Sequence, residues 1–352
     1  MTSLGQTVVV CGGTAGVGRA TALQFARAGY RVAVIARGEQ GLAGTLAELE
    51  RIGVPALAIS ADMADAAAVD RAAERIEREL GPIEVWVNSA MVTLFGPISE
   101  AKAEDIRRVT EVTYLGFVHG TLAALRHMRP RDRGVIVQVG SALSYRAIPL
   151  QSAYCGAKFA IRGFTDSLRC ELLHDRSRVR VTMVQLPAHN TPQFDWARNL
   201  MNKRPQPVPP IHTPEVAARA ILKAARETPR ELWLGKAAFQ SILGNMVMPG
   251  LLDRMLANRA WDGQLTPESE TPGRPDNLYA PVEGLHRTDG RFTQQAQDKA
   301  VGLGSEQVGL LLAGGVALLA GVTGLAIAAA TRSRVRAELE QARPSLRRLF
   351  RH

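Results

Sequence analysis

Cysteine is scarce in this sequence. The 352 residues contain three, Cys11, Cys155 and Cys170, at no spacing that is typical of a metal site. An odd and sparse count argues against a disulfide scaffold and is typical of a protein in a reducing compartment. The first ten residues have no basic stretch before their apolar run, so we expect no cleavable signal sequence.

Positive charge is in excess, at +10, yet the chain has no basic stripe with interleaved aromatic residues. Residues 331–352 contain seven arginines and two glutamates, which amounts to +5 and half of the excess. The remainder is only mildly basic, so we expect no nucleic-acid binding. The apolar share of 46% is enough, at this length, for one large α/β domain or two smaller ones.

Glycine is concentrated where the first predicted strand, Thr7–Val10, ends. Gly12, Gly16 and Gly18 follow at G-x-x-x-G-x-G spacing, and apolar residues from Ala22 onward predict a helix. The first glycine allows a tight turn, the second lets the backbone approach a pyrophosphate, and the third lets the helix pack closely on the strand. Free N–H groups at a helix N-terminus favour anions. The pattern predicts a dinucleotide cradle, although glycines at such turns can also serve packing alone.

The second predicted strand, Arg31–Ile35, leads into Ala36-Arg37 and has no acid where NAD-preferring folds hold the ribose 2′-OH. A guanidinium at Arg37 suits a 2′-phosphate, because phosphate accepts charge-assisted, bidentate hydrogen bonds. The alternative is an ordinary solvated arginine. We expect NADP in preference to NAD.

Polar residues follow the next two predicted strands. Asp62, just past Val54–Ile59, can accept from an adenine amino group or cap the following helix, a role that suits Asp65 better. Asn88 ends the strand Val85–Asn88. Its side chain can either touch the cofactor ribose or tie strand ends together.

Strands alternate with helices over most of the chain. Three more strands are predicted over Val135–Val139, Arg180–Leu186 and Glu231–Leu234, and three more helices over Glu104–Met128, Ser152–Leu173 and Pro214–Thr228. The strands are nearly continuous apolar runs. This pattern predicts a Rossmann-type α/β fold, in which a doubly wound parallel sheet lies between two layers of helices.

Tyr154 precedes Lys158 by four residues, which places both side chains on one face of a helix. Ser141 ends an apolar run and can meet Tyr154 from a neighbouring strand. A nearby ammonium lowers the pKa of a tyrosine from its usual value of about 10, and a serine hydroxyl can hold a carbonyl oxygen. With a hydride donor opposite, Tyr154 can protonate a ketone or aldehyde, or deprotonate an alcohol in reverse. Taken alone, the tyrosine and lysine can equally be a surface pair.

Together these motifs resemble the short-chain dehydrogenase/reductase family over roughly Thr7 to Leu234. The resemblance rests on the glycine turn, on Asp62, on Asn88-Ser89-Ala90-Met91, and on Ser141, Tyr154 and Lys158. It implies a seven-stranded sheet of order 3-2-1-4-5-6-7, homo-oligomers packed through the long helices, Lys158 on the nicotinamide ribose and Thr191 on the carboxamide. The cofactor-binding residues that it implies are Gly12, Thr14, Gly16, Val17, Gly18, Arg37, Asp62, Met63, Asn88, Ala90, Tyr154, Lys158, Pro187 and Thr191.

Four positions depart from the family pattern. Cys11 replaces a threonine before the first glycine, Met91 replaces a glycine at the cofactor rim, and Ala188 replaces a glycine after Pro187. Thr113 stands where the family has an asparagine that bends its helix and holds a water linking the lysine to solvent. We expect Thr113 to take part in catalysis with a slower proton relay, not with loss of activity.

The C-terminal third is expected to consist of several parts after a catalytic domain of residues 1–235. Residues 236–263 predict apolar helices broken at Pro249-Gly250. Residues 264–304, rich in proline, glycine and charge, predict a linker or an extended surface segment. Residues 305–330 include the uncharged run Val308–Ala330, and an arginine-rich tail, 331–352, follows.

The run Val308–Ala330 is long enough to span a bilayer, which needs about 20 residues. The arginines beyond it would place the enzyme outside under the positive-inside rule. NADP chemistry and reduced cysteines favour a cytoplasmic catalytic domain instead. The segment therefore spans against that rule or lies in the interface. The alternatives without a membrane are a buried interface helix and an alanine-rich disordered end.

Asp195–Pro210 is rich in proline and predicts a substrate lid or a plain connector. Phe194, Trp196 and Leu200 favour an apolar, lipid-like or steroid-like substrate. The leading hypothesis is an NADP-dependent oxidoreductase acting on a ketone or aldehyde and the corresponding alcohol. The alternatives are a non-catalytic dinucleotide-binding or redox-sensing module at a membrane, and an isomerase or dehydratase on the same fold.

Overall fold

A computed structural model describes residues 5–311, 313–314 and 331–333 of the chain. The chain divides into two compact units, residues 1–304 and residues 305–352. The first unit contains the central sheet and all the residues that the sequence predicts for the site.

The central sheet has eight strands among the described residues, in the order β14-β11-β7-β6-β4-β1-β2-β3. Seven strands run parallel, which confirms the predicted order, and β14 adds an antiparallel edge strand that the sequence did not predict. The strands are β1 (Thr7–Cys11), β2 (Arg31–Ala36), β3 (Ala56–Ser60), β4 (Ile83–Asn88), β6 (Val135–Ser141), β7 (Arg180–Leu186), β11 (Glu231–Leu234) and β14 (Gly302–Gly304).

The strand register brings the carboxyl ends of the central strands to one edge of the sheet. Cys11 pairs with Asn88, Asn88 pairs with Gln138, and Ser141 pairs with Leu186. In an open parallel sheet, ligands bind outside this edge, where the strand order changes direction. The polar residues predicted for the site are thereby brought together.

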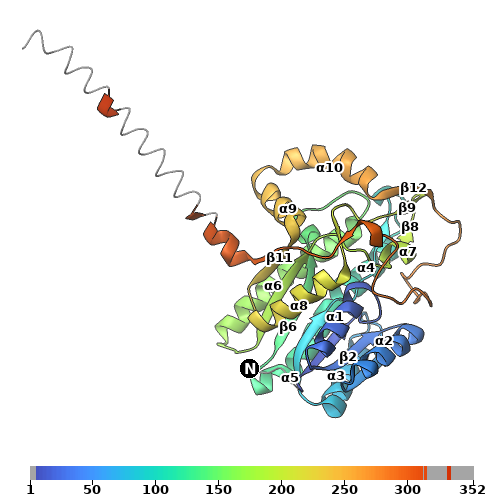
Figure 1. Cartoon of the computed structure of the whole chain (residues 1–352), viewed down its shortest axis with the longest axis vertical. Helices are drawn as coiled ribbons and strands as arrows, with labels where there is room; N and C mark the ends of the chain where they lie inside the picture. Colours follow the sequence, from blue (N-terminus) through green and yellow to red (C-terminus); the bar gives the residue numbers. More distant parts are fainter. Residues whose placement is uncertain (1–4, 312, 315–330, 334–352) are drawn as a thin grey trace, which may run out of the picture. The chain divides into compact units, whose positions relative to one another are not determined.

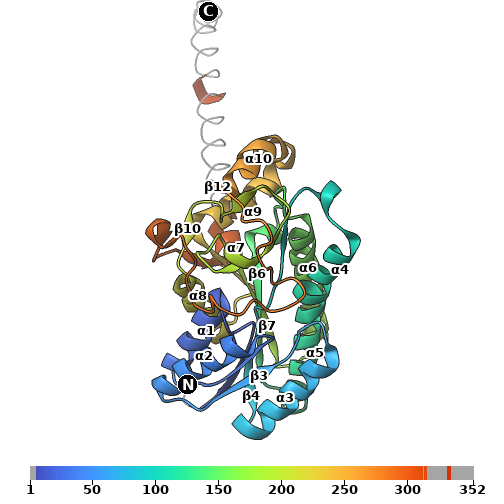
Figure 2. The same cartoon turned by 90° about the vertical axis from the view of Figure 1, so that its right-hand side faces the viewer.

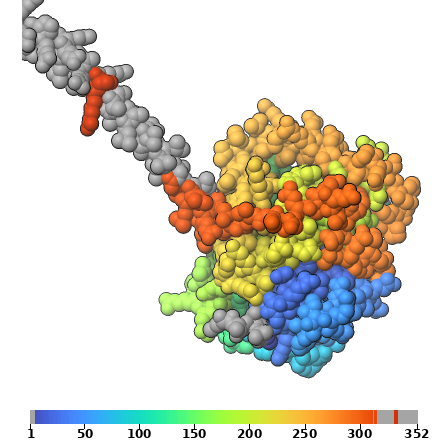
Figure 3. Space-filling model, in the orientation of Figure 1, coloured from blue at the N-terminus to red at the C-terminus, as the bar shows by residue number. Residues whose placement is uncertain are grey.

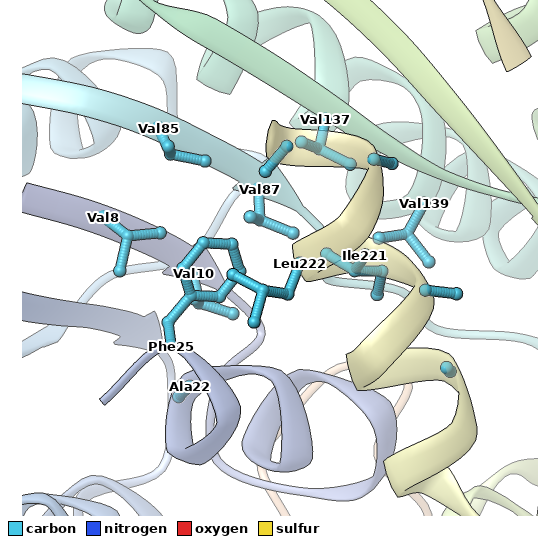
Figure 4. Packing of buried hydrophobic residues seen from close by; sticks show 14 of the residues in the cluster. Val8, Val10, Ala22, Phe25, Val85, Val87, Val137, Val139, Ile221 and Leu222 are labelled. Carbon is cyan, nitrogen blue, oxygen red and sulfur yellow. The ribbon is translucent and has the colours of Figure 1, made fainter. Parts of the chain in front are cut away.

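Helices cover both faces of the sheet (Figures 1 and 2). Those on one face are α1 (Gly16–Arg27), α2 (Glu39–Ile52) and α8 (Pro214–Glu227), and those on the other are α3 (Ala66–Leu80), α5 (Gly116–Met128) and α6 (Ser152–His174). Figure 4 shows the core of the first face, where strand valines such as Val10 and Val87 point toward Phe25 of α1 and Ile221 of α8. Apolar side chains on both faces explain why the strand sequences are continuous and not alternating.

The predicted helix Glu104–Met128 is interrupted. It forms α4 (Ala103–Thr110), a π-helical turn over Glu111–Leu115, and then α5. Thr113 lies in this turn, and its hydroxyl donates to Val92 O at 2.8 Å and accepts from Val92 N at 3.0 Å. The wide turn thus occurs where a buried side chain bonds a neighbouring loop instead of its own helix.

Segments within 193–212 and 235–297 lie at the carboxyl edge of the sheet. They include α7 (Gln193–Trp196), α9 (Gly235–Val247) and α10 (Pro249–Gly263), and the last two meet at the predicted break. Short strand pairs join distant parts: β5 (Leu94–Phe95) with β8 (Arg198–Asn199), β9 (Lys203–Pro205) with β12 (Leu265–Ser269), and β10 (Ile211–His212) with β13 (Ala296–Gln297). The segment 264–304 belongs to the first compact unit.

In the second unit, residues 305–311 are helical. Most of the predicted apolar run Val308–Ala330 and of the tail 331–352 lies outside the described residues. Among the residues that are described, none of the helices has the length and apolar character needed to cross a membrane.

Candidate active site

Three glycines shape the turn from β1 into α1. Gly12 has φ +77°, and a Cβ there would lie 2.7 Å from Ala90 Cα. Gly16 has φ +53°, and a Cβ on Gly18 would lie 2.1 Å from Gly12 O. The N-cap residue of α1, Ala15, offers no side-chain acceptor to the first-turn N–H groups, so an anion suits this helix end. The turn fits the pyrophosphate of a dinucleotide.

The turn opens into a cleft of about 440 Å³ along the carboxyl edge of the sheet. This size is typical of small-molecule sites, which hold about 300–1,000 Å³. The predicted site residues that line the cleft are Gly12, Thr14, Gly16, Val17, Gly18, Arg37, Asp62, Met63, Ala90, Ser141, Tyr154, Lys158, Pro187 and Thr191. The structure thus brings the predicted residues together, with the exceptions of Asn88 and Thr113.

Asn88 lies behind the cleft and is fully buried. Its side-chain oxygen accepts from Trp86 Nε1 at 2.8 Å, and its side-chain nitrogen donates to Gln138 Oε1 at 2.9 Å. The same nitrogen lies 3.2 Å from Thr121 Oγ1 on α5. Of the two roles that the sequence left open for Asn88, the structure shows that its side chain links the ends of neighbouring strands.

The hydroxyl of Thr113 makes two hydrogen bonds with the backbone of Val92, so its part in a proton relay stays a prediction.

Ser141 and Tyr154 meet at the centre of the cleft. Ser141 ends β6, where its side chain accepts from Leu143 N at 3.1 Å and its backbone N–H donates to Ser144 Oγ at 3.2 Å. These bonds form a capping box that fixes the orientation of Ser141. Burial raises the pKa of Tyr154 above its usual value, and a hydrogen bond with Ser141 partly opposes that rise.

Lys158 lies on the same face of α6 and is almost fully buried. Its Nζ donates to Val139 O at 2.7 Å and lies 4.6 Å from the centre of the Phe117 ring and 5.5 Å from that of Tyr154. Burial lowers the pKa of Lys158 to about 7. The sequence predicted that the ammonium would lower the pKa of Tyr154. Burial of the phenol raises that pKa instead.

Asp62 and Arg37 lie at the other end of the cleft. Asp62 pairs with Arg108 and accepts from Ala64 N at 2.9 Å, whereas Asp65 caps α3 by accepting from Ala68 N at 3.0 Å. The guanidinium of Arg37 donates to backbone carbonyls from residues 277–279, at 2.5 Å to Asn277 O and 3.0 Å to Tyr279 O. Desolvation lowers the pKa of Arg37. The sequence did not predict that residues after 264 would contribute to this end of the site.

His189 is a cleft residue that the sequence analysis missed. Its Nδ1 lies 2.9 Å from Pro187 O, and its buried Nε2 has no hydrogen-bond partner among the described residues. Burial lowers the pKa of His189 to about 4, so the imidazole is neutral at pH 7 and Nε2 is an acceptor. The only signal was its place in the sequence, between Pro187 and Thr191.

Apolar side chains also line the cleft. They include Phe194 and Trp196 from the predicted lid, together with Val208 and with Leu256 of α10. Leu200, also expected on the lid, packs instead near Gly96, where a Cβ would lie 2.7 Å from Leu200 Cβ. The arrangement suits a substrate with a large apolar part.

The family model for short chain dehydrogenases matches residues 6–200, more than half of the chain. The chain belongs to the short-chain dehydrogenase family, whose members are oxidoreductases that bind NAD or NADP.

Among known proteins, the chain is 32% identical to the uncharacterized oxidoreductase YxnA of Bacillus subtilis. The similarity extends over 283 residues, which are 80% of this chain and 80% of that protein. It is 30% identical over 229 residues to 3-dehydrosphinganine reductase of Danio rerio, covering 63% of this chain and 68% of that protein. It is 33% identical over 168 residues to 17-beta-hydroxysteroid dehydrogenase 13 of Rattus norvegicus, covering 48% and 56%.

The lowered pKa of Lys158 predicts that stability depends on pH. The pKa of Lys158 is about 7 in the folded chain and 10.5 at its usual value. At a pH between these two values, Lys158 is protonated in the unfolded chain and mostly neutral in the folded chain. The free energy of unfolding should therefore rise with pH across this interval, by up to about 1.4 kcal/mol per pH unit from this group. Urea unfolding at pH 7, 8 and 9 measures the slope, with Lys158→Met as the control that should lack this component. Equal slopes for the two proteins would show that Lys158 is not desolvated.

Proposed function

We propose that this chain is an NADP(H)-dependent oxidoreductase that interconverts a ketone or aldehyde and the corresponding alcohol. The observation that carries the proposal is that Ser141, Tyr154 and Lys158 line one cleft together with the glycine turn. A binding module would need the turn alone. A proton donor and an oxygen-holding hydroxyl in the same cleft are needed only when a carbonyl reacts.

The nicotinamide, when bound, supplies or accepts the hydride. The chain itself handles the oxygen and its proton. Ser141 holds the carbonyl oxygen, and the raised pKa of Tyr154 keeps the phenol protonated at neutral pH, which is the form that donates during reduction. Lys158 lies one helical turn away with a pKa of about 7 and can return a proton to the phenolate.

The preference for NADP rests on charge at the end of β2. Arg37 lines the cleft there, with Gly38 as its neighbour and without an acid at that position. Arg108, which pairs with Asp62, lies close by, since Arg37 and Arg108 both donate to Leu278 O. Two guanidinium groups favour a 2′-phosphate over a hydroxyl.

For the substrate we propose a ketone or alcohol with a large apolar body, lipid-like or steroid-like. Phe95, Phe194, Trp196 and Leu256 line the same cleft as Tyr154. The similarity to 3-dehydrosphinganine reductase and to 17-beta-hydroxysteroid dehydrogenase 13 supports this class.

A homo-oligomer through the long helices is part of the proposal. Leu122 on α5 and Phe159 and Leu173 on α6 are exposed by 46%, 42% and 68%, although all three are large and apolar. Such side chains on neighbouring helices are typical of an interface.

Substituting Tyr154→Phe should abolish turnover while cofactor binding remains. Loss of the proton donor should lower NADPH oxidation with a panel of apolar ketones by at least about a hundredfold. NADPH affinity, followed by fluorescence, should change little. Tyr30→Phe, in the core away from the cleft, is the matched control. If wild type binds NADPH tightly but turns over no ketone or aldehyde, the chain is the non-catalytic dinucleotide-binding module instead.

Substituting Arg37→Gln should reduce the preference for NADPH over NADH by at least about tenfold, because charge-assisted hydrogen bonds to the 2′-phosphate are lost. Titrations with both nucleotides give the ratio of dissociation constants. Arg51→Gln, an exposed arginine on α2, should leave the ratio unchanged. A parallel loss of affinity for both nucleotides would mean that Arg37 acts only through the residues that it contacts at 277–279.

Placing a charge on the exposed α5–α6 surface should dissociate the oligomer. The double variant Leu122→Asp/Phe159→Asp should have a smaller mass by light scattering than wild type, because an interface cannot bury two unpaired carboxylates cheaply. Leu251→Asp, exposed by 58% on α10, should not change the mass. A monomeric wild-type protein would contradict the proposed assembly.

A further inference from the structure

Residues 277–290, hereafter the strap, run across the cleft beyond the region that the family model matches. Both ends are held by the segment that follows β7. At one end Asn277 N donates to Trp196 O at 2.8 Å, and at the other Gly290 N donates to Asn190 O at 3.2 Å. A Cβ on Gly290 would lie 2.4 Å from Thr191 O, so the chain passes very close to the predicted carboxamide residue.

Between its ends the strap contacts the dinucleotide side of the cleft. Leu278 O accepts from Arg108 Nε at 3.1 Å, in addition to the carbonyl contacts made by Arg37. Arg287 O accepts from Gly16 N at 3.0 Å, at the glycine turn itself. Arg19 of α1 donates to Thr14 O and to His286 O, which joins the strap to the same turn.

The strap also supplies part of the cleft wall. Asn277, Pro281, Val282 and His286 line the cleft opposite the glycine turn and Arg37. In the space-filling view this region of the chain, coloured orange, lies against the blue N-terminal part (Figure 3). A dinucleotide with its phosphates at the turn would therefore be enclosed between α1 and the strap.

Two of the hydrogen-bond donors that contact the strap could also bind an anion. The guanidinium of Arg37 and the N–H of Gly16 both meet carbonyl oxygens of the strap. Carbonyl oxygens are weaker acceptors than phosphate oxygens. A phosphate at either place would replace these contacts, so cofactor binding and strap position depend on each other.

The strap is held by few apolar contacts. Leu278 is fully buried in a small cluster with Val92, Leu94, Val109 and Val112, whereas Leu285 is 44% exposed. Segments with little apolar burial open at low free-energy cost. The strap can therefore open without unfolding of the sheet.

We propose that the strap forms the outer wall of the cofactor site and must open for the dinucleotide to enter or leave. The proposal rests on the proposed function, because it takes the ligand to be NADP(H). It assigns a gating role to residues outside the family's matched region, and it links this gate to the predicted lid through Trp196.

A reversible disulfide tests the gate. A Cβ on Gly38 would lie 3.2 Å from Pro281 Cβ, near the Cβ–Cβ distance of about 3.8 Å in disulfides. The φ of Gly38, −80°, suits any residue. The variant with Gly38→Cys and Pro281→Cys, made with Cys170→Ser to remove the exposed thiol, should form a bond across the cleft. Oxidation of the protein without nucleotide should slow NADPH association by at least about tenfold, and a reducing agent should restore the rate. Stopped-flow fluorescence measures this rate.

The same protein oxidised after loading should retain NADPH, with release slowed to a similar degree. Each single-cysteine variant is a control and should respond to neither oxidant nor reductant. Equal rates in oxidised and reduced protein would overturn the gate while leaving the proposed function intact. Failure of the disulfide to form, measured by thiol titration, would overturn the placement of the strap. Absence of NADPH binding in every state would overturn the proposed function itself.

Loosening the strap should have the opposite effect. Leu278→Ala removes its buried anchor, which does not line the cleft, and should speed NADPH release by about tenfold or more. Leu285→Ala makes the same chemical change at an exposed position of the strap and should leave release unchanged. Equal release rates in both variants and wild type would contradict the gate.

Discussion

The close approach of helix α1 to the end of β1 is the contact on which the rest of the site depends. Because Gly18 has no side chain, the helix can sit where a Cβ would be 2.1 Å from Gly12 O. That position aims the N-terminus of α1 along the carboxyl edge of the sheet. Ser141 reaches the same edge from β6, and α6 brings Tyr154 and Lys158 to it.

Burial determines the acid–base character of the cleft. It raises the pKa of Tyr154 and lowers that of Lys158, since both charged forms lose water. An uncharged tyrosine next to a lysine that titrates near neutrality is therefore favoured over an ion pair. In the proposed reaction the phenol donates to a developing alkoxide, and Lys158, whose ammonium is a stronger acid than the phenol, reprotonates the phenolate.

The sequence predicts much of this because the relevant signals are local. Apolar runs predicted the strands, the glycine spacing predicted the turn, and the resemblance to the family implied the strand order. The serine, tyrosine and lysine were recognisable from their distances along the chain and their place after a strand. Each signal reports a backbone or helix-face requirement that one short segment satisfies alone.

Other features leave no such local signal. The role of Asn88 depended on which neighbours its amide found, and Trp86, Gln138 and Thr121 come from three elements. The π-helical turn contains Thr113, whose hydroxyl bonds to Val92, a residue on another segment. The strap binds mainly through backbone carbonyls, which every residue possesses, so its sequence showed only polarity and proline.

A crystal structure of the full chain with bound NADP⁺ tests the central claim most directly. The account predicts the pyrophosphate at the N-terminus of α1, the 2′-phosphate at Arg37, and the nicotinamide between Thr191 and Tyr154, with the strap closed over the dinucleotide. A nucleotide bound away from the glycine turn, or a nicotinamide out of reach of Tyr154, would contradict it.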